Sequence, residues 1–162
     1  VVDEAAPNDL KISTNQDINV KGLHLALDAA RRSGIRKAIY LSTFNIFRNF
    51  FKRVVVEDEL PKTHEVYGFT KILGEFVCRM FGECHDMTVI ALRLYYPRSD
   101  LEWHARAVEG KPFRCLAASD LVELIRCSLR LEQTGYHAFA ASGDYEEKTI
   151  QRCILSSRFY KA

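Results

Sequence analysis

The stretch Tyr67-Gly68-Phe69-Thr70-Lys71 opens the helix around which the rest of the chain is organised. From Phe69 onward apolar residues recur at helical spacing, and this pattern predicts a helix over about residues 68–82 with one continuous buried stripe. The predicted stripe consists of Phe69, Ile72, Leu73, Phe76, Val77, Met80 and Phe81. Tyr67 and Lys71 stand four residues apart, so their side chains are expected to share one face of the first turns.

Tyr67 and Lys71 form a pair with a chemical use. A lysine ammonium near a phenol stabilises the phenolate and lowers the pKa of the tyrosine, which predicts Tyr67 as an acid/base near neutral pH. The Tyr-x-x-x-Lys pattern alone is weak evidence, because a solvated tyrosine and lysine on a helix produce it by chance. The segments on either side of the helix decide between these two interpretations.

Buried strands are predicted on both sides of this helix. One is the apolar run at about 38–42, which is followed by the hydroxyl of Thr43, and the other is the run at about 88–94. Apolar strands that alternate with helical patterns predict a parallel sheet with crossover helices. We therefore expect these two strands to be central in a parallel sheet, flanked by the helix above and by another at 17–33.

Composition places the chain among ordinary globular proteins. With 162 residues, of which 48% are hydrophobic and 27% charged, it can bury a core. A net charge of +2 is too small to indicate a nucleic acid or an anionic membrane as partner. No apolar run has the length of a membrane span, and the five cysteines and five histidines lack ligand spacing. We expect no metal, no disulfide framework and a reducing, cytoplasmic compartment.

Together the strand, the Tyr-x-x-x-Lys helix and the second strand resemble the extended short-chain dehydrogenase/reductase family, the NAD-dependent epimerases and dehydratases of nucleotide sugars. The resemblance runs from about Val1 to Leu94. It implies an α/β fold, namely a Rossmann-like parallel sheet with flanking helices, incomplete at the N-terminus, plus a small C-terminal α+β portion. Residues 1–95 would be the C-terminal half of a Rossmann-like NAD(P)-binding domain, and residues 96–162 a small substrate-side portion.

The resemblance also implies roles for single residues. Thr43 would hydrogen-bond the reacting oxygen, Tyr67 would move the proton, and Lys71 would bind the nicotinamide ribose. The cofactor would be NAD or NADP, and the substrate a nucleotide sugar. The residues expected to bind the cofactor are Ala5, Ala6, Asn19, Thr43, Tyr67 and Lys71. A homodimer is among the assemblies that the resemblance allows.

Asn19 and Tyr96 keep alternatives open. Asn19-Val20-x-Gly22 resembles the family's Asn-Val-x-Gly segment, so Asn19 would help order the site, or it is a polar residue in a first helical turn. Tyr96 stands where relatives tend to carry an asparagine that touches substrate. We therefore expect Tyr96 to bind substrate, and the identity of the substrate stays open.

The sequence contains no Gly-x-x-Gly-x-x-Gly and no Gly-x-Gly-x-x-Gly motif. Dinucleotide folds use such a turn to hold the pyrophosphate, so the chain alone is not expected to bind a whole dinucleotide tightly. The first residue is not Met, and we expect the chain to begin inside a longer gene product. It is then part of an NAD(P)-dependent epimerase, dehydratase or reductase with a Thr-Tyr-Lys site, or a degenerate, inactive relative that serves as a binding or structural subunit.

Four further segments complete the prediction. Residues 8–16 are polar and predict a loop, and 44–61 combines aromatic with basic residues and predicts a lid over the substrate cleft. The alternation at 136–140 predicts a strand. Residues 146–155 are expected to form a last helix.

Overall fold

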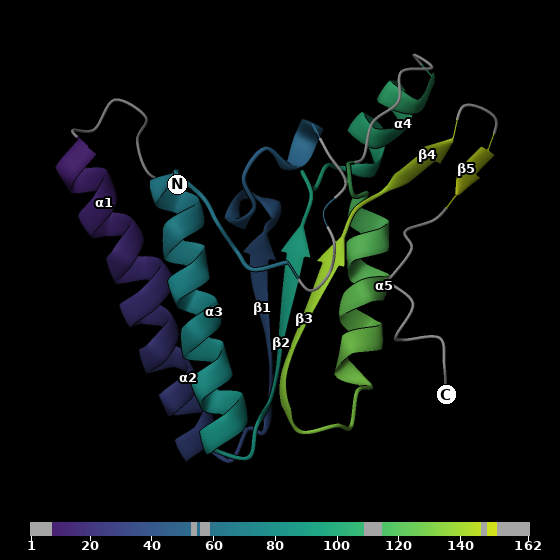
Figure 1. The fold of residues 1–162 in the computed structure, drawn as a ribbon. Helices are drawn as coiled ribbons and strands as arrows, with labels where there is room; N and C mark the ends of the chain where they lie inside the picture. The colour runs from purple at the N-terminus through teal and green to yellow at the C-terminus, as the bar shows by residue number, and fades with distance from the viewer. Residues whose placement is uncertain (1–7, 53–54, 56–58, 109–114, 147–148, 152–162) are drawn as a thin grey trace.

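Three parallel strands form the centre of the molecule and carry helices on both faces (Figure 1). The computed structural model describes residues 8–52, 55, 59–108, 115–146 and 149–151. Its elements are α1 (Asn8–Gln16), the π-helix η1 (Asp17–Gly22), α2 (Leu23–Arg32), β1 (Lys37–Thr43), the short 3-10 helices η2 (Phe44–Ile46) and η3 (Phe50–Lys52), α3 (Val66–Cys84), β2 (Thr88–Leu94), α4 (Asp100–Val108), α5 (Ala118–Leu129), β3 (Gly135–Ala141), β4 (Asp144–Glu146) and β5 (Thr149–Gln151).

The sheet has the order β1-β2-β3, and both pairs are parallel. The register aligns Thr43 with Leu94 and Leu94 with Ala141, so all three strands end at one edge. Every residue of β2 is buried, as expected for a central strand covered on both faces. The predicted parallel pairing of the runs at 38–42 and 88–94 is therefore confirmed.

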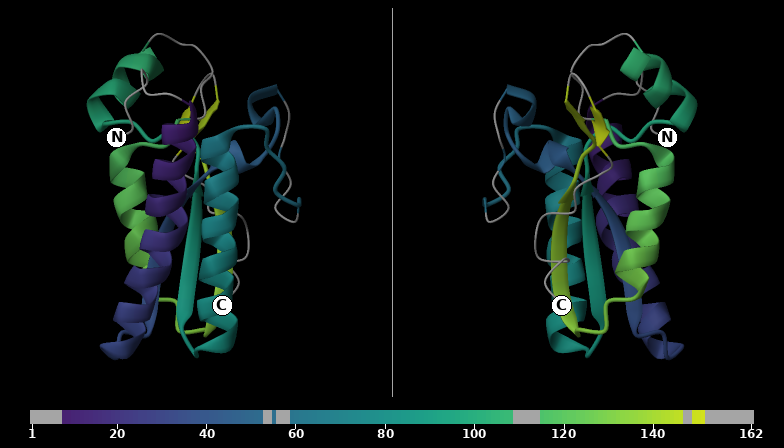
Figure 2. Two further views of the ribbon diagram at one scale, coloured as in Figure 1. Left: turned by 90° about the vertical axis from the view of Figure 1, so that its left-hand side faces the viewer. Right: turned by 90° about the vertical axis from the view of Figure 1, so that its right-hand side faces the viewer.

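Alternate residues of the strands build two separate cores, because successive side chains point to opposite faces of a sheet. On one face Tyr40, Val89 and Ala91 pack with residues of α2 and α3, namely Leu27, Cys78 and Phe81. On the other face Ile90, Leu92 and Phe139 pack with Leu124 of α5. Figure 2 shows the helices on the two sides of the sheet.

The helix α3 is two residues longer at each end than the predicted range 68–82, and it buries a different face. Phe69 and Phe76 are 50% and 62% exposed, so the predicted continuous buried stripe is wrong. The buried residues are small or polar for the most part: Gly68, Thr70, Gly74, Glu75, Cys78, Phe81 and Gly82. Small residues allow the helix to approach its neighbours closely, and a stripe seen in a sequence does not say which side meets the sheet.

Two of the sequence expectations fail near the ends of the described chain. Residues 8–16 form α1 instead of a loop, because a polar segment can be helical where it packs along another helix, here α3. The helix expected at 146–155 is contradicted by β4 and β5, which pair antiparallel from Asp144 with Gln151 to Glu146 with Thr149. Residues 152–155 lie outside the described residues.

The remaining expectations for the C-terminal part fare better. The strand predicted at 136–140 is confirmed as the central part of β3. With α4, α5 and the β4–β5 pair, β3 makes up the α+β content of the range 96–162. Because β3 pairs with β2, the range 96–162 contributes a strand to the same sheet, and a domain boundary near residue 95 stays a prediction.

None of the helices in the described ranges has the length and the apolar character that a membrane span requires.

Candidate functional site

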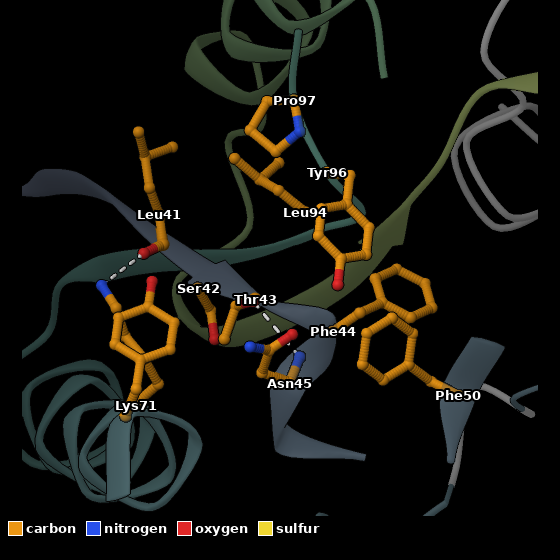
Figure 3. Close-up of a pocket in the computed structure, with 11 residues that line it drawn as sticks. Leu41, Ser42, Thr43, Phe44, Asn45, Phe50, Lys71, Leu94, Tyr96 and Pro97 are labelled. Carbon is orange, nitrogen blue, oxygen red and sulfur yellow. Dashed lines mark hydrogen bonds between the residues drawn. The ribbon is translucent and has the colours of Figure 1, made fainter. Parts of the chain in front are cut away.

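A pocket of about 350 Å³ opens beyond the C-terminal ends of β1 and β2 (Figure 3). Open α/β sheets bind their ligands at this edge, outside the carboxyl ends of the strands. The residues that line the pocket are Leu41, Ser42, Thr43, Phe44, Asn45, Phe50, Tyr67, Lys71, Leu94, Tyr96 and Pro97. They include the three residues expected to be catalytic and the one expected to bind substrate.

Thr43 is the last residue of β1, and its backbone is extended. Its hydroxyl accepts a hydrogen bond from the backbone N–H of Asn45 at 3.2 Å, which fixes the side chain at the strand end. A hydroxyl that accepts one bond can still donate its own proton. Thr43 can therefore donate to an oxygen placed in the pocket.

Tyr67 comes from the first turn of α3, which starts very close to the loop after β1. A Cβ at Gly68 would lie 2.3 Å from the carbonyl oxygen of Asn45, so only glycine permits this approach. The side chain of Tyr67 is 42% exposed and lines the pocket. We expect the hydroxyls of Thr43 and Tyr67 to lie within hydrogen-bonding range of each other or to be linked by one water.

Lys71 lies at the inner side of the pocket. Its Nζ donates to the carbonyl oxygen of Leu41 at 2.9 Å and lies 4.7 Å from the ring centroid of Tyr40 and 5.7 Å from that of Tyr67. Burial lowers the pKa of Lys71 and raises the pKa of Tyr67. In the chain by itself, loss of hydration of the phenolate therefore sets the direction of the pKa of Tyr67, and a lowering of that pKa by Lys71 stays a prediction.

Asn19 does not line the pocket but contacts the helix that carries Tyr67 and Lys71. Its Nδ2 donates to Oγ1 of Thr70 at 3.1 Å, and that Oγ1 donates to the carbonyl oxygen of Tyr67 at 2.9 Å. This pair of bonds favours the ordering role over that of a polar residue in a first turn. Ala5 and Ala6 lie outside the described residues.

Tyr96 forms the far wall of the pocket together with an aromatic cluster. Its φ of +38° is left-handed, which is uncommon for a residue other than glycine and is typical of functional segments. Its ring centroid lies 6.2 Å from that of Phe50 and 5.3 Å from that of Tyr95. In the segment predicted as a lid, Phe44 and Phe50 line the pocket and Phe47 is buried, while a closing movement stays a prediction.

Glu75 is a buried residue of the site region that the sequence reasoning missed. Its carboxylate accepts hydrogen bonds from one side chain of each strand: Ser42 of β1 at 2.6 Å, Arg93 of β2 at 2.8 Å and Tyr136 of β3 at 3.0 Å. The sequence did contain a signal for this contact, namely an acidic residue inside an apolar helix and an arginine inside a buried strand. Because buried charges are usually paired, these two residues could have been predicted to form an ion pair. Within the described ranges, no three metal-binding side chains gather.

The comparisons with known proteins agree with this architecture. The model of the NAD-dependent epimerase/dehydratase family matches residues 6–113. No curated protein sequence matches the chain. Among solved structures, a short-chain dehydrogenase/reductase superfamily protein from Agrobacterium tumefaciens with bound NAD is similar, at a TM-score of 0.70 and 17% identity over 96% of this chain and 59% of that one.

Two further solved structures are similar. The UDP-N-acetylglucosamine 4-epimerase from Bacillus cereus has a TM-score of 0.66 and 18% identity, covering 88% of this chain and 56% of that one. MoeE5 in complex with UDP-glucuronic acid and NAD has a TM-score of 0.65 and 17% identity, covering 85% of this chain and 50% of that one. The chain thus spans between half and three fifths of the length of these structures, and at such identities the likeness shows the fold alone.

Proposed function

The chain belongs to the NAD-dependent epimerase/dehydratase family, and from this premise we propose that its pocket is the active site of an NAD(P)-dependent enzyme acting on a nucleotide sugar. The observation that carries the proposal is that Thr43, Tyr67 and Lys71 line one pocket, although they come from a strand end and two turns of a helix. Three donors facing one cavity can hold and protonate the oxygen of a sugar carbinol or ketone. Relatives with UDP-sugars support the substrate class.

The residues present fit the nicotinamide end of the cofactor. Lys71 has three N–H donors, and its described acceptor is the oxygen of Leu41, so donors remain for ribose hydroxyls. The sequence offers no Gly-rich turn for the pyrophosphate. When bound, NAD(P) supplies the reversible oxidation of a sugar carbon. Thr43 then orients the reacting oxygen, and Tyr67 exchanges a proton with it.

The first prediction separates the two ends of the cofactor. Nicotinamide mononucleotide and NAD should bind the 162-residue chain equally, no better than about millimolar, near −4 kcal/mol. The reason is that Thr43 and Lys71 offer only a few hydrogen bonds, each worth roughly 0.5–1.5 kcal/mol net. The measurement is a titration followed by amide chemical shifts, in which the signals of Thr43, Asn45 and Tyr67 should move.

Two controls sharpen this titration. Adenosine monophosphate at the same concentration should leave the three signals in place. Lys71→Met should weaken the binding of nicotinamide mononucleotide several-fold, whereas the surface substitution Glu83→Gln should leave that binding unchanged. Micromolar binding of NAD, or equal shifts with adenosine monophosphate, would place the cofactor site elsewhere. No shift at all would favour the second candidate function.

That second candidate is a degenerate relative that serves as a binding or structural subunit. The observation in its favour is Tyr96, which lines the pocket where the resemblance leads one to expect an asparagine. In this case the pocket keeps its shape and binds a sugar or nucleotide without turnover. Tyr67→Phe in a protein that does turn over substrate should abolish activity and spare affinity, whereas a binding subunit has no activity to lose.

We also propose that the chain pairs with a second copy of itself through the outer face of α2 and α3. These helices pack side by side, and Leu25 and Phe76 on this face are 60% and 62% exposed. Charges of both signs flank the apolar residues, with Lys21 on η1 and Glu83 on α3. Because a face with both signs can complement itself under two-fold symmetry, a second copy is the partner that suits it.

A further inference from the structure

Tyr40 is a second tyrosine beside Lys71, and it belongs to the core of the molecule instead of the pocket wall. It lies in β1, is only 8% exposed and packs in the cluster of Leu27, Cys78 and Phe81. Its ring centroid lies 4.7 Å from Nζ of Lys71, nearer than the 5.7 Å of Tyr67. Among the described residues, its hydroxyl has no hydrogen-bond partner.

The structure makes room for this phenol at a local cost. A Cβ at Gly74 would lie 2.3 Å from the hydroxyl of Tyr40 and 2.8 Å from its Cζ, so α3 needs glycine at this position. A glycine inside a helix costs roughly 0.5–1 kcal/mol relative to alanine, and an unpaired buried hydroxyl also costs free energy. The hydroxyl of Tyr40 therefore gives no stabilisation that would offset the cost of Gly74 or of its own burial. The ring is the part of Tyr40 that makes a favourable contact.

Lys71 is the group that needs such a contact. Its side chain is partly buried, and burial lowers its pKa. The titratable groups near it are Tyr40 on β1 and Tyr67 and Cys78 on α3. The carboxylate of Glu75 instead accepts hydrogen bonds from side chains of the three strands. A cation over the face of an aromatic ring within about 6 Å is attracted by the ring quadrupole. Tyr40 is the ring that meets this condition most closely.

We propose that Tyr40 is a positioning residue, whose ring face holds the ammonium of Lys71 charged and directed toward the carbonyl oxygen of Leu41. The use of that charge rests on the proposed function, because a charged Lys71 is what would bind a ribose and favour a phenolate at Tyr67. The position of the charge itself does not depend on any cofactor. Its test can therefore fail or succeed apart from the titration with nicotinamide mononucleotide.

The experiment follows the Nζ and Cε signals of Lys71 in the isotope-labelled 162-residue chain as a function of pH, with Lys71→Arg used for assignment. Tyr40→Leu removes the ring and should increase the acid dissociation constant of Lys71 by roughly five-fold, equivalent to about 1 kcal/mol of lost cation–π attraction. Tyr40→Phe keeps the ring and removes the unpaired hydroxyl. It should leave the dissociation constant as in the original chain.

The outcomes are decisive in both directions. An unchanged Lys71 titration in folded Tyr40→Leu overturns the proposal, and so does an equal change in Tyr40→Phe, which would assign the effect to the hydroxyl. If Tyr40→Leu does not fold, the original chain still tests the proposal. Nuclear Overhauser contacts between the Lys71 ε-methylene and the Tyr40 ring protons support it, and their absence overturns it.

Discussion

At the scale of single residues, the buried phenols are the groups whose ionisation responds most to the fold. Burial, with smaller contributions from Cys78 and Glu75, raises the pKa of Tyr40 well above its usual value. Burial and the neighbouring carboxylate of Glu75 likewise raise the pKa of Tyr136. Both side chains stay protonated in the folded chain at pH values where an unfolded chain would ionise them.

The fold should therefore lose stability at alkaline pH. Above the ordinary tyrosine value of 10.0, the unfolded chain binds fewer protons than the folded one. Each of the two phenols should then lower the free energy of unfolding by about 1.4 kcal/mol per pH unit. Lys71 acts in the opposite sense up to its ordinary value of 10.5, because its folded pKa is lowered.

Urea unfolding at a series of pH values from 9 to about 11 measures this slope. Tyr40→Phe should reduce it by the contribution of one phenol. A slope unaffected by Tyr40→Phe would mean that this hydroxyl already ionises in the folded chain. Either result reports on the same buried side chain that we infer to position Lys71.

At the scale of elements, the position of α3 on the sheet is set by polar contacts as well as by packing. Glu75 is 6% exposed, and its carboxylate accepts hydrogen bonds from Ser42, Arg93 and Tyr136, one residue from each strand. Lys71 precedes Glu75 by one turn of the helix, and Ser42 precedes Thr43 in the chain. Glu75 therefore ties the helix that carries Tyr67 and Lys71 to the strand end that carries Thr43.

Glu75→Gln should lower the free energy of unfolding by about 3–5 kcal/mol, because it leaves the buried guanidinium of Arg93 without its counter-charge. Chemical denaturation measures the loss. Adding Arg93→Met to Glu75→Gln should recover part of it, since both charges are then gone. Arg126→Gln is the matched control: the exposed pair of Arg126 and Glu123, at 2.7 Å, should contribute less than about 1 kcal/mol.

At the scale of the whole molecule, helices cover the sheet on two faces (Figure 2). One helical layer nevertheless keeps large apolar side chains exposed on its outer side. Phe69, Phe76 and Met80 share one side of α3, and Leu25 lies on the adjacent α2. Large apolar side chains exposed together on one side of a helix are typical of an interaction site. It is the surface that we propose to join two copies of the chain.

The dimer prediction is tested with a pair of charge substitutions. Phe76→Glu should shift the chain from dimer to monomer in sedimentation-velocity runs, because the carboxylate would be buried at the centre of the contact. Val122→Glu changes a side chain that is 47% exposed on α5 and should leave the dimer intact. A monomeric original chain, or a dimer in both variants, would exclude this face as the interface.

The sequence by itself determined the class of fold and named four of the residues that line the pocket, namely Thr43, Tyr67, Lys71 and Tyr96. Apolar strands alternating with helices predicted the parallel pairing of β1 and β2, and the spacing of Tyr67 and Lys71 placed them on one helical face. Thr43 was recognisable at a strand end. These features follow from local periodicity, which short segments carry without reference to the rest of the chain.

Only the tertiary structure decided which side of α3 is buried, where the Lys71 ammonium points and why Glu75 lies inside an apolar helix. Each of these depends on strands distant in the sequence, because Leu41, Tyr40 and Arg93 meet α3 only once the sheet has formed. The helix at 8–16 is a further case, since its polar sequence has little helical preference until it packs along α3. Periodicity in a sequence shows that a helix has two different faces. Which of them is buried is determined by the segments that the helix packs against.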